Sequence, residues 1–229
     1  MRKYLNLKTL QLMTAAAGFG LISGCSILSP VDLPQVKQYQ ILSPNLPVNQ
    51  SSTAQTAGTQ KSHKPFDLTL FAAPLTADSP YNSTQMYYRE HNFELSSYTQ
   101  NAWAAEPQQM LGKNLLQALQ HYRSFKSVVS SNFIGYADYR LTGNLNQLTQ
   151  IIEGNNNRVI LSVTYTLTDA NSGQAVSVKT FALEQETSAD AQGFAQAANK
   201  LAEHLAKALN DWLLSQPPSS QHNNPLKKG

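Results

Sequence analysis

Apolar and polar residues alternate along several stretches of this 229-residue chain, and this period of two predicts a half-buried β-sheet. The alternation is plainest between Val159 and Leu167, where every second residue is apolar. The predicted strands cover residues 37–42, 67–71, 85–89, 93–98, 125–130, 136–148, 159–168 and 174–186. Turns rich in Gly and Asn, at 154–157 and 169–173, join the last three strands into an antiparallel meander. A slip of phase in the last strand predicts a bulge near Lys179.

Two other stretches repeat apolar residues every three to four positions, which is the period of an amphipathic helix. The first helix begins at Glu106-Pro107, since proline is tolerated in a first turn, and its stripe is Leu111, Leu115, Ala118, Leu119 and Tyr122. The second covers about 189–214, capped by Thr187 or Ser188 with Asp190 complementing its dipole. Its continuous face is Phe194, Ala198, Leu201, Leu205, Ala208 and Trp212. Together these elements predict a two-layer α+β fold, with two helices packed on one face of a mainly antiparallel sheet.

Segments that cannot bury apolar surface set the domain boundaries. Residues 43–65 are Pro, Ser, Thr, Gln, Asn and Gly with little to bury, and we interpret them as a disordered insert. Residues 217–229 are interpreted as a disordered tail on the same ground. The folded domain is therefore predicted to cover residues 37–216.

The N-terminus has the three parts of a secretory signal peptide, predicted over residues 1–24. Basic residues precede an apolar run, at about 10–22, that is too short and interrupted to span ~30 Å of hydrocarbon comfortably. Ser23 and Gly24 then lead into Cys25, the single cysteine of the chain. This segment resembles a bacterial lipobox, and the resemblance implies a diacylglycerol on the Cys25 sulfur and an acyl chain on its amine. A structural cysteine is the alternative.

Residues 25–36 then form a lipidated tether in this interpretation, and three acyl chains make the anchoring effectively permanent. Ser26 follows the cysteine, and resemblance to enterobacterial sorting rules implies export to the outer membrane, with the domain in the periplasm. The chain holds 17 basic and 14 acidic residues, but removing the signal leaves 14 of each. A nearly neutral mature protein gives no indication of nucleic acid as a partner.

Motifs for catalysis, metal binding or phosphate binding are absent from the sequence. His63 and His222 fall in the insert and the tail, and the other three histidines lie in unrelated elements. There is no HExxH, no paired cysteine, no Gly-rich loop before a helix and no Gly-x-Ser-x-Gly elbow. We therefore expect a protein that is not an enzyme and holds no cofactor or metal, apart from the covalent lipid on Cys25.

The order and spacing of several short motifs resemble the ABC-type transport auxiliary lipoprotein family, which includes the paraquat-inducible C-type lipoproteins. The motifs are Arg89, Tyr98, Asn101-Ala102-Trp103-Ala104, Pro107, Phe125 to Val128, Asp138 to Gly143, Leu167 to Asp169 and Trp212, behind the lipobox. The resemblance covers nearly the whole mature domain. It implies a non-enzymatic accessory subunit that docks with an MCE-domain protein, its permease and its ATPase, and helps to move lipid between membranes.

Three residues in these motifs are candidates for docking to that partner: Trp103, Arg89 and Tyr98. Trp is enriched at interface hot spots, but Trp103 is favoured as a core anchor for the first helix. For Arg89, an ion pair with Glu94 is favoured over a partner contact.

Two other functions are left open by the sequence. One is a structural or regulatory lipoprotein of a cell-wall or lipopolysaccharide assembly machine. The other is a lipid-binding chaperone, which needs an apolar cavity between helices and sheet, although the many alanines of the second helix indicate close packing. Homo-oligomerisation is left open too.

Overall fold

The computed structural model describes residues 35–42, 66–132 and 135–216. Every described helix and strand lies within the unit of residues 36–229. The predicted signal peptide, most of the tether with Cys25, the 43–65 insert and the 217–229 tail lie outside the described residues.

Strand β7 (Tyr139–Ile151) is the centre of a nine-stranded sheet, because other strands pair with both of its edges. On one edge it forms an antiparallel meander with β8 (Arg158–Asp169) and β9 (Ala175–Glu186), as the sequence predicts. On the other edge three shorter strands run parallel to β7, one after another along its length: β2 (Phe66–Ala72), β3 (Thr76–Ala77) and β4 (Gln85–Arg89).

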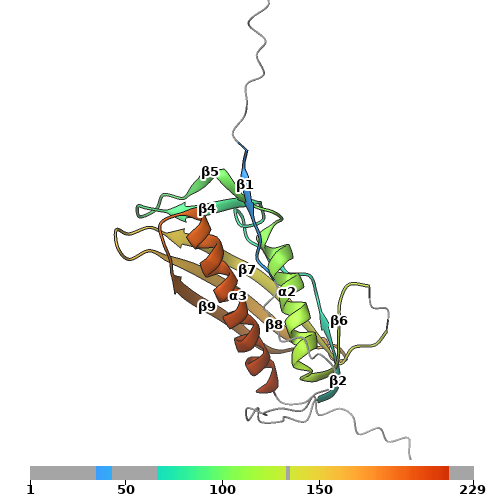
Figure 1. Ribbon diagram of the computed structural model, residues 1–229. Coiled ribbons are helices and arrows are strands. Elements are labelled where there is room, and N and C mark those ends of the chain that lie inside the picture. Colours follow the sequence, from blue (N-terminus) through green and yellow to red (C-terminus); the bar gives the residue numbers. More distant parts are fainter. Residues whose placement is uncertain (1–34, 43–65, 133–134, 217–229) are drawn as a thin grey trace, which may run out of the picture. The chain divides into compact units, whose positions relative to one another are not determined.

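Two extensions of the sheet begin at β2 and β4 (Figure 1). Strand β6 (Phe125–Val129) pairs in parallel with β2. Strand β5 (Ser96–Trp103) pairs antiparallel with β4, and the short β1 (Lys37–Tyr39) adds to β5 in parallel. We call β4, β5 and the turn between them the β4–β5 hairpin.

The predicted α+β fold class is confirmed, and the two helices of the described residues lie on one side of the sheet (Figure 1). The three longest strands pair antiparallel with one another, as predicted, but five pairings are parallel, three of them between a shorter strand and β7, so the sheet is mixed. Side chains alternate in the same way in both kinds of strand, and only the connections decide the direction of pairing. The alternation pattern could not separate them.

Helix α2 (Pro107–Tyr122) begins at the predicted proline, and its predicted stripe is buried except for the half-buried Tyr122. Helix α3 (Ala191–Leu214) likewise buries its predicted face, with Ala208 half-buried. The predicted N-cap of α3, Thr187 or Ser188, is wrong, because the N-cap is Asp190, two or three residues further on. Its Oδ1 accepts a hydrogen bond of 2.7 Å from the Gly193 amide, and this bond lowers the pKa of the Asp190 carboxyl.

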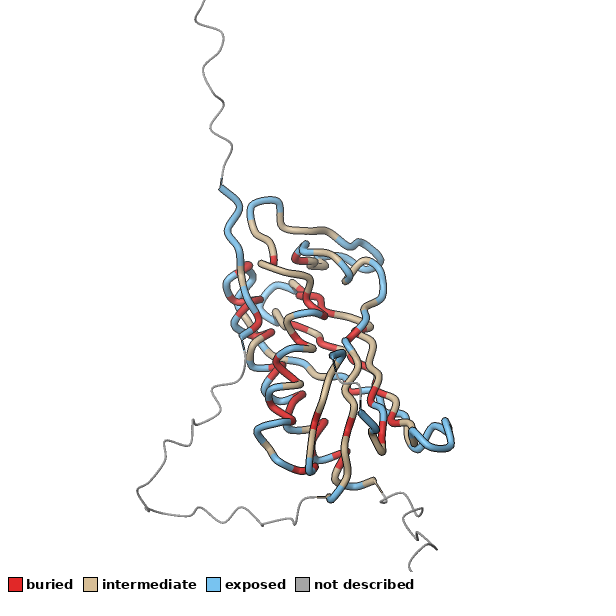
Figure 2. Tube along the Cα trace, turned by 90° about the vertical axis from the view of Figure 1, so that its right-hand side faces the viewer, coloured by how far each residue is buried: buried red, intermediate tan, exposed pale blue. Residues whose placement is uncertain are grey.

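The core lies between the helices and the sheet, and both layers contribute buried residues to it (Figure 2). Aromatic side chains join the layers. Trp103 at the end of β5 packs edge-on against Phe194 of α3, with ring centroids 5.2 Å apart. Tyr165, Phe181 and Trp212 form a second row, with centroids 6.3 and 6.1 Å apart. Each row ties α3 to the sheet.

The bulge predicted near Lys179 is not where the sheet is irregular. Pairing between β8 and β9 runs unbroken through Lys179, and its register shifts at the start of β9, opposite Leu167 and Thr168. Strand β9 is the free edge of the meander, and Val178 is 60% exposed there. The broken alternation therefore reflects an apolar residue at an exposed edge. The predicted turns at Gly154 and Gly173 are confirmed, and both glycines have positive φ.

Candidate docking surface

Trp103 is a core residue in the structure. Its side chain is 1% exposed, because it ends β5 beneath the N-terminal part of α3 and contacts Phe194. A partner could reach the ring only after the core had opened. The geometry therefore favours the structural role of Trp103 over a docking role.

Arg89 ends β4 and is half-buried. Its carbonyl oxygen accepts a hydrogen bond of 2.9 Å from the Ile152 amide, which continues the pairing with β7. The ion pairs formed among the described residues involve Lys126 and Arg158, so the expected pair between Arg89 and Glu94 is not formed. The Glu94 amide instead lies 3.4 Å from the His91 carbonyl oxygen in the turn.

Tyr98 belongs to a hydrogen-bonded chain that joins β5, β7 and the start of α3. Its hydroxyl donates to Gln150 Oε1 at 2.8 Å, and the centroid of its ring lies 4.8 Å from the centroid of the Tyr88 ring. Gln150 is fully buried and its Nε2 donates to the carbonyl oxygens of Ser188, at 2.6 Å, and Asp190, at 3.3 Å. These bonds fix the β4–β5 hairpin to the N-terminus of α3.

The Tyr98 hydroxyl gives a prediction about alkaline stability. Burial, with a smaller effect of the Asp190 carboxylate, raises the pKa of Tyr98 from 10.0 to about 12. The unfolded chain therefore loses this proton first, and the free energy of unfolding falls as pH rises from about 10 to about 12. Tyr98→Phe should flatten this decline in urea unfolding followed from about pH 9 to about pH 11.

At neutral pH the same Tyr98→Phe change should cost about 1 kcal/mol, because buried Gln150 Oε1 loses its donor. The matched control is Tyr136→Phe, which removes a hydroxyl from a side chain that is 59% exposed. An equal effect of the two changes on the alkaline decline would contradict the assignment to Tyr98.

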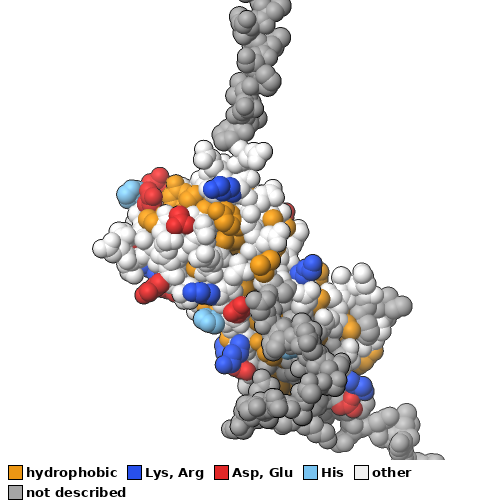
Figure 3. Space-filling model, in the orientation of Figure 1, with side chains coloured by type: hydrophobic (Ala, Val, Ile, Leu, Met, Phe, Trp, Pro, Cys, Tyr) orange, Lys and Arg blue, Asp and Glu red, His pale blue; other side chains and the backbone are white. Residues whose placement is uncertain are grey.

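The tip of the β4–β5 hairpin exposes two apolar side chains, Phe93 and Leu95, which belong to the strand predicted over residues 93–98. Phe93 is fully exposed and has a φ of 70°, so it lies in the turn, and Leu95 is 42% exposed. Glu90 and Glu94 are exposed beside them. Figure 3 shows hydrophobic side chains gathered at this end of the domain, next to acidic ones. We call Phe93, Leu95, Glu90 and Glu94 the hairpin tip. An apolar residue inside a charged turn was the signal that could have found it.

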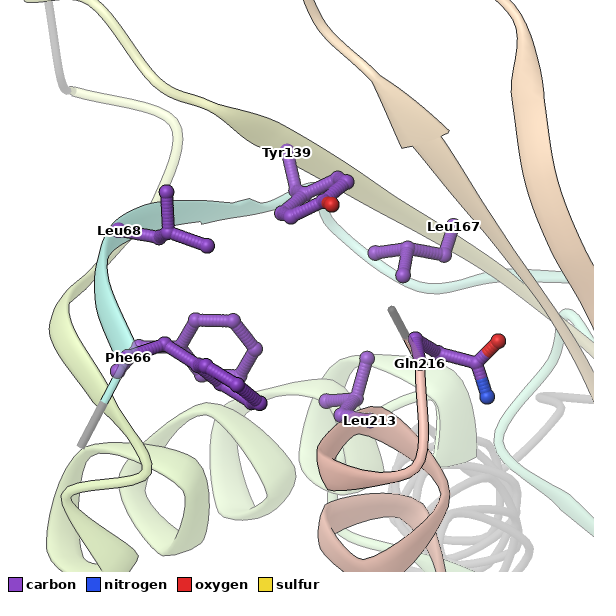
Figure 4. A pocket seen from close by; sticks show the side chains of 7 residues that line it. Phe66, Leu68, Tyr139, Leu167, Leu213 and Gln216 are labelled. Atoms are coloured by element: carbon purple, nitrogen blue, oxygen red, sulfur yellow. The ribbon is translucent and has the colours of Figure 1, made fainter. Parts of the chain in front are cut away.

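One apolar cavity lies between the end of α3 and the sheet, and it is small. The apolar cavity between the end of α3 and the sheet is lined by seven residues, including Phe66, Leu68, Tyr139 and Leu213 (Figure 4), and measures about 10 Å³. That volume is about the space of one water molecule. An acyl chain does not fit there in this conformation.

The described ranges contain no cluster of three or more His, Cys, Asp or Glu residues that could hold a metal ion. Within the same ranges, neither helix is long and apolar enough to cross a membrane.

Comparison with known proteins identifies the class. The chain belongs to the family of the ABC-type transport auxiliary lipoprotein component, whose model matches residues 46–210. The family predicted from the sequence motifs is therefore confirmed. Membership indicates a membrane-anchored lipoprotein of the cell envelope that is associated with an ABC transporter. No curated protein sequence matches the chain.

Solved structures show the same fold at low sequence identity. A Xanthomonas campestris protein of the DUF330 family has a TM-score of 0.58 and 18% identity, over 65% of this chain and 86% of that one. An uncharacterized protein has a TM-score of 0.55 and 14% identity, and the match covers 78% of this chain and 99% of that one. A PelC dodecamer from Paraburkholderia phytofirmans reaches a TM-score of only 0.40 with 14% identity, over 62% and 85%, so it does not bear on assembly.

Proposed function

We propose that this protein is the outer-membrane-anchored periplasmic accessory subunit of an ABC/MCE-type lipid transport system. In this proposal Cys25 carries the lipid anchor and the folded domain docks to the MCE-domain protein that works with a permease and an ATPase. The domain performs no catalysis. The family match supports the transport role, and the exposed hairpin tip is the observation that carries docking.

The chemistry of the hairpin tip favours a protein partner. Phe93 offers a whole aromatic ring to solvent, and buried aromatic rings are typical anchors of interfaces. Glu90 and Glu94 beside it would meet an anionic lipid surface unfavourably, whereas they complement Lys or Arg. We therefore propose that the partner surface is an apolar pocket with a basic rim.

Docking is favoured over carrying lipid. A lipid chaperone needs an enclosed apolar cavity, and the apolar cavity between the end of α3 and the sheet, about 10 Å³, holds no acyl chain. Buried alanines such as Ala195, Ala198 and Ala202 bring the α3 backbone close to its neighbours. A mature domain that extracts fluorescent phospholipid from vesicles would contradict this preference.

Docking through the hairpin tip predicts a site-specific cross-link. A photoreactive phenylalanine analogue at residue 93 should cross-link the lipidated protein to an MCE-domain protein in intact cells. The same analogue at residue 178 is the control, because Val178 is also exposed but lies on the free edge strand β9.

Docking through the hairpin tip also predicts a loss of affinity. Phe93→Ser should lower the affinity of the purified lipidated protein for the MCE-domain protein by about tenfold or more. Val178→Ser should leave the affinity unchanged, and neither change should alter the melting temperature much. Equal cross-linking at both positions, or an unchanged affinity of Phe93→Ser, would contradict docking through the hairpin tip.

A further inference from the structure

Residues 37–42 are attached to three separate elements of the domain, and we call this segment the strap. Its first half is β1, which pairs with residues 101–103 of β5. The Tyr39 carbonyl oxygen also accepts a bond of 2.7 Å from the Ala104 amide. Its second half, residues 40–42, is held by side chains of α2 and α3. The strap directly follows the predicted tether in the sequence.

Two asparagines bind the backbone of the second half of the strap. Asn199 of α3 donates from Nδ2 to the Gln40 carbonyl oxygen at 2.9 Å and accepts from the Leu42 amide at 2.7 Å. Asn114 of α2 donates from its Nδ2 to the Ile41 carbonyl oxygen at 2.8 Å. Side-chain amides here act as a neighbouring strand would, pairing with the polar groups of an extended segment.

The strap can detach without disrupting the rest of the sheet. Ile41, at 4% exposed, is its single buried side chain. Strand β1 has three residues and lies at the edge of the sheet, so β5 keeps its pairing with β4 when β1 leaves. Short edge segments with few buried contacts open locally, well below the free energy of global unfolding.

We propose that the strap can detach from β5, α2 and α3, and that its detachment sets how far the folded domain reaches from its membrane anchor. This inference rests on the proposed lipid anchor at Cys25. With the strap docked, residues 26–36 link anchor and domain and span at most about 36–40 Å. With the strap released, residues 26–65 form the link and span at most about 130–145 Å. Release thus lets the domain follow a partner away from the membrane.

Hydrogen exchange of the full mature chain tests the opening itself. We expect the amides of Ile41 and Leu42 to exchange at least about tenfold faster than those of β8, because they open locally. Asn199→Ala removes two of the bonds to the strap and should speed this exchange about tenfold further, without changing β8. Gln196→Ala, an exposed amide on the same helix, is the control. Exchange of the strap and β8 at one common rate would overturn the proposal.

A disulfide that holds the strap on β5 tests whether release of the strap extends the reach of the domain from the membrane. Gln38 and Ala102 are partners in the β1–β5 register, so Gln38→Cys with Ala102→Cys places two cysteines at a distance that a disulfide can bridge. The lipidated protein is placed in phospholipid vesicles containing an acceptor lipid, with a donor dye at residue 178. Asn114→Ala with Asn199→Ala should lower the energy transfer, and the disulfide should restore it.

The outcomes separate the strap from the anchor. Equal energy transfer in the Asn114→Ala/Asn199→Ala variant, with or without the disulfide, would overturn the release mechanism. A mature chain that fails to bind vesicles would instead overturn the anchor and with it the reach, while hydrogen exchange would still decide whether the strap opens. Cross-linking at residue 93 is independent of both measurements.

Discussion

Trp103→Ala is expected to lower the free energy of unfolding by about 3–5 kcal/mol, the usual cost of truncating a buried aromatic residue. Trp103 is 1% exposed and its ring contacts Phe194 at a centroid distance of 5.2 Å, so the change leaves a cavity between β5 and α3. The free energy of unfolding of a typical domain is about 5–15 kcal/mol, so the stability of the Trp103→Ala variant should be marginal. Urea unfolding of the mature domain measures the loss.

Two companion variants separate a core role of Trp103 from a docking role. Trp103→Phe keeps an aromatic ring against Phe194 and should lose clearly less stability. The double variant with Phe194→Ala should lose less than the sum of the single changes, because both remove one contact, with a coupling of about 0.5–1.5 kcal/mol. A Trp103→Ala domain of unchanged stability that failed to bind its partner would contradict the core role.

Gly143→Ala is expected to cost about 2–3 kcal/mol, at the upper end for overpacking a core. A Cβ added to Gly143 in β7 would overlap the Tyr165 ring and lie 2.7 Å from Leu75 Cδ1. Tyr165 is itself buried, so its ring cannot turn out to solvent without exposing the core. Thermal and urea unfolding measure this loss in the free energy of unfolding.

The clash at Gly143 can be relieved by a second change, which makes the prediction specific. Tyr165→Val opens space, so Gly143→Ala should cost much less in that background. Gly154→Ala is the control, because nothing lies near an added Cβ there and its φ of 59° makes strain the whole cost, about 1–2 kcal/mol. The Gly154 cost should be the same in both backgrounds. Equal costs of Gly143→Ala in both backgrounds would show that the Tyr165 ring is not the obstacle.

Local periodicity was enough to predict the elements that bury a face. The meander of β7, β8 and β9 and both helices follow from alternation, turns and stripes, since each buried face repeats with the period of its element. The parallel pairing of β2, β3 and β4 with β7 could not be predicted, because strand direction depends on connections that periodicity does not contain. The α3 cap was misplaced because Ser188 and Asp190 both suit an N-cap.

The candidate site was predicted less completely, for a related reason. Motif order identified Tyr98 and Arg89, and the structure places both on the β4–β5 hairpin. Gln150 was missed because the predicted strand ends at residue 148 whereas β7 continues to Ile151, and its burial depends on Tyr98 and the start of α3. Phe93 was assigned to a strand because Phe93 and Leu95 alternate with polar residues, and this pattern outweighed the charged residues that indicated a turn. The Asn199 contacts with the strap join residues more than 150 positions apart, beyond any local pattern.

Purification of the lipidated protein from its native membranes, in mild detergent, tests the central claim of an envelope transport accessory most directly. The proteins and lipids that co-purify are then identified by mass spectrometry. We predict recovery of an MCE-domain protein together with its permease and ATPase, reduced by Phe93→Ser. Recovery of a cell-wall synthase or a lipopolysaccharide assembly factor in their place would contradict the proposed function, while leaving the fold intact.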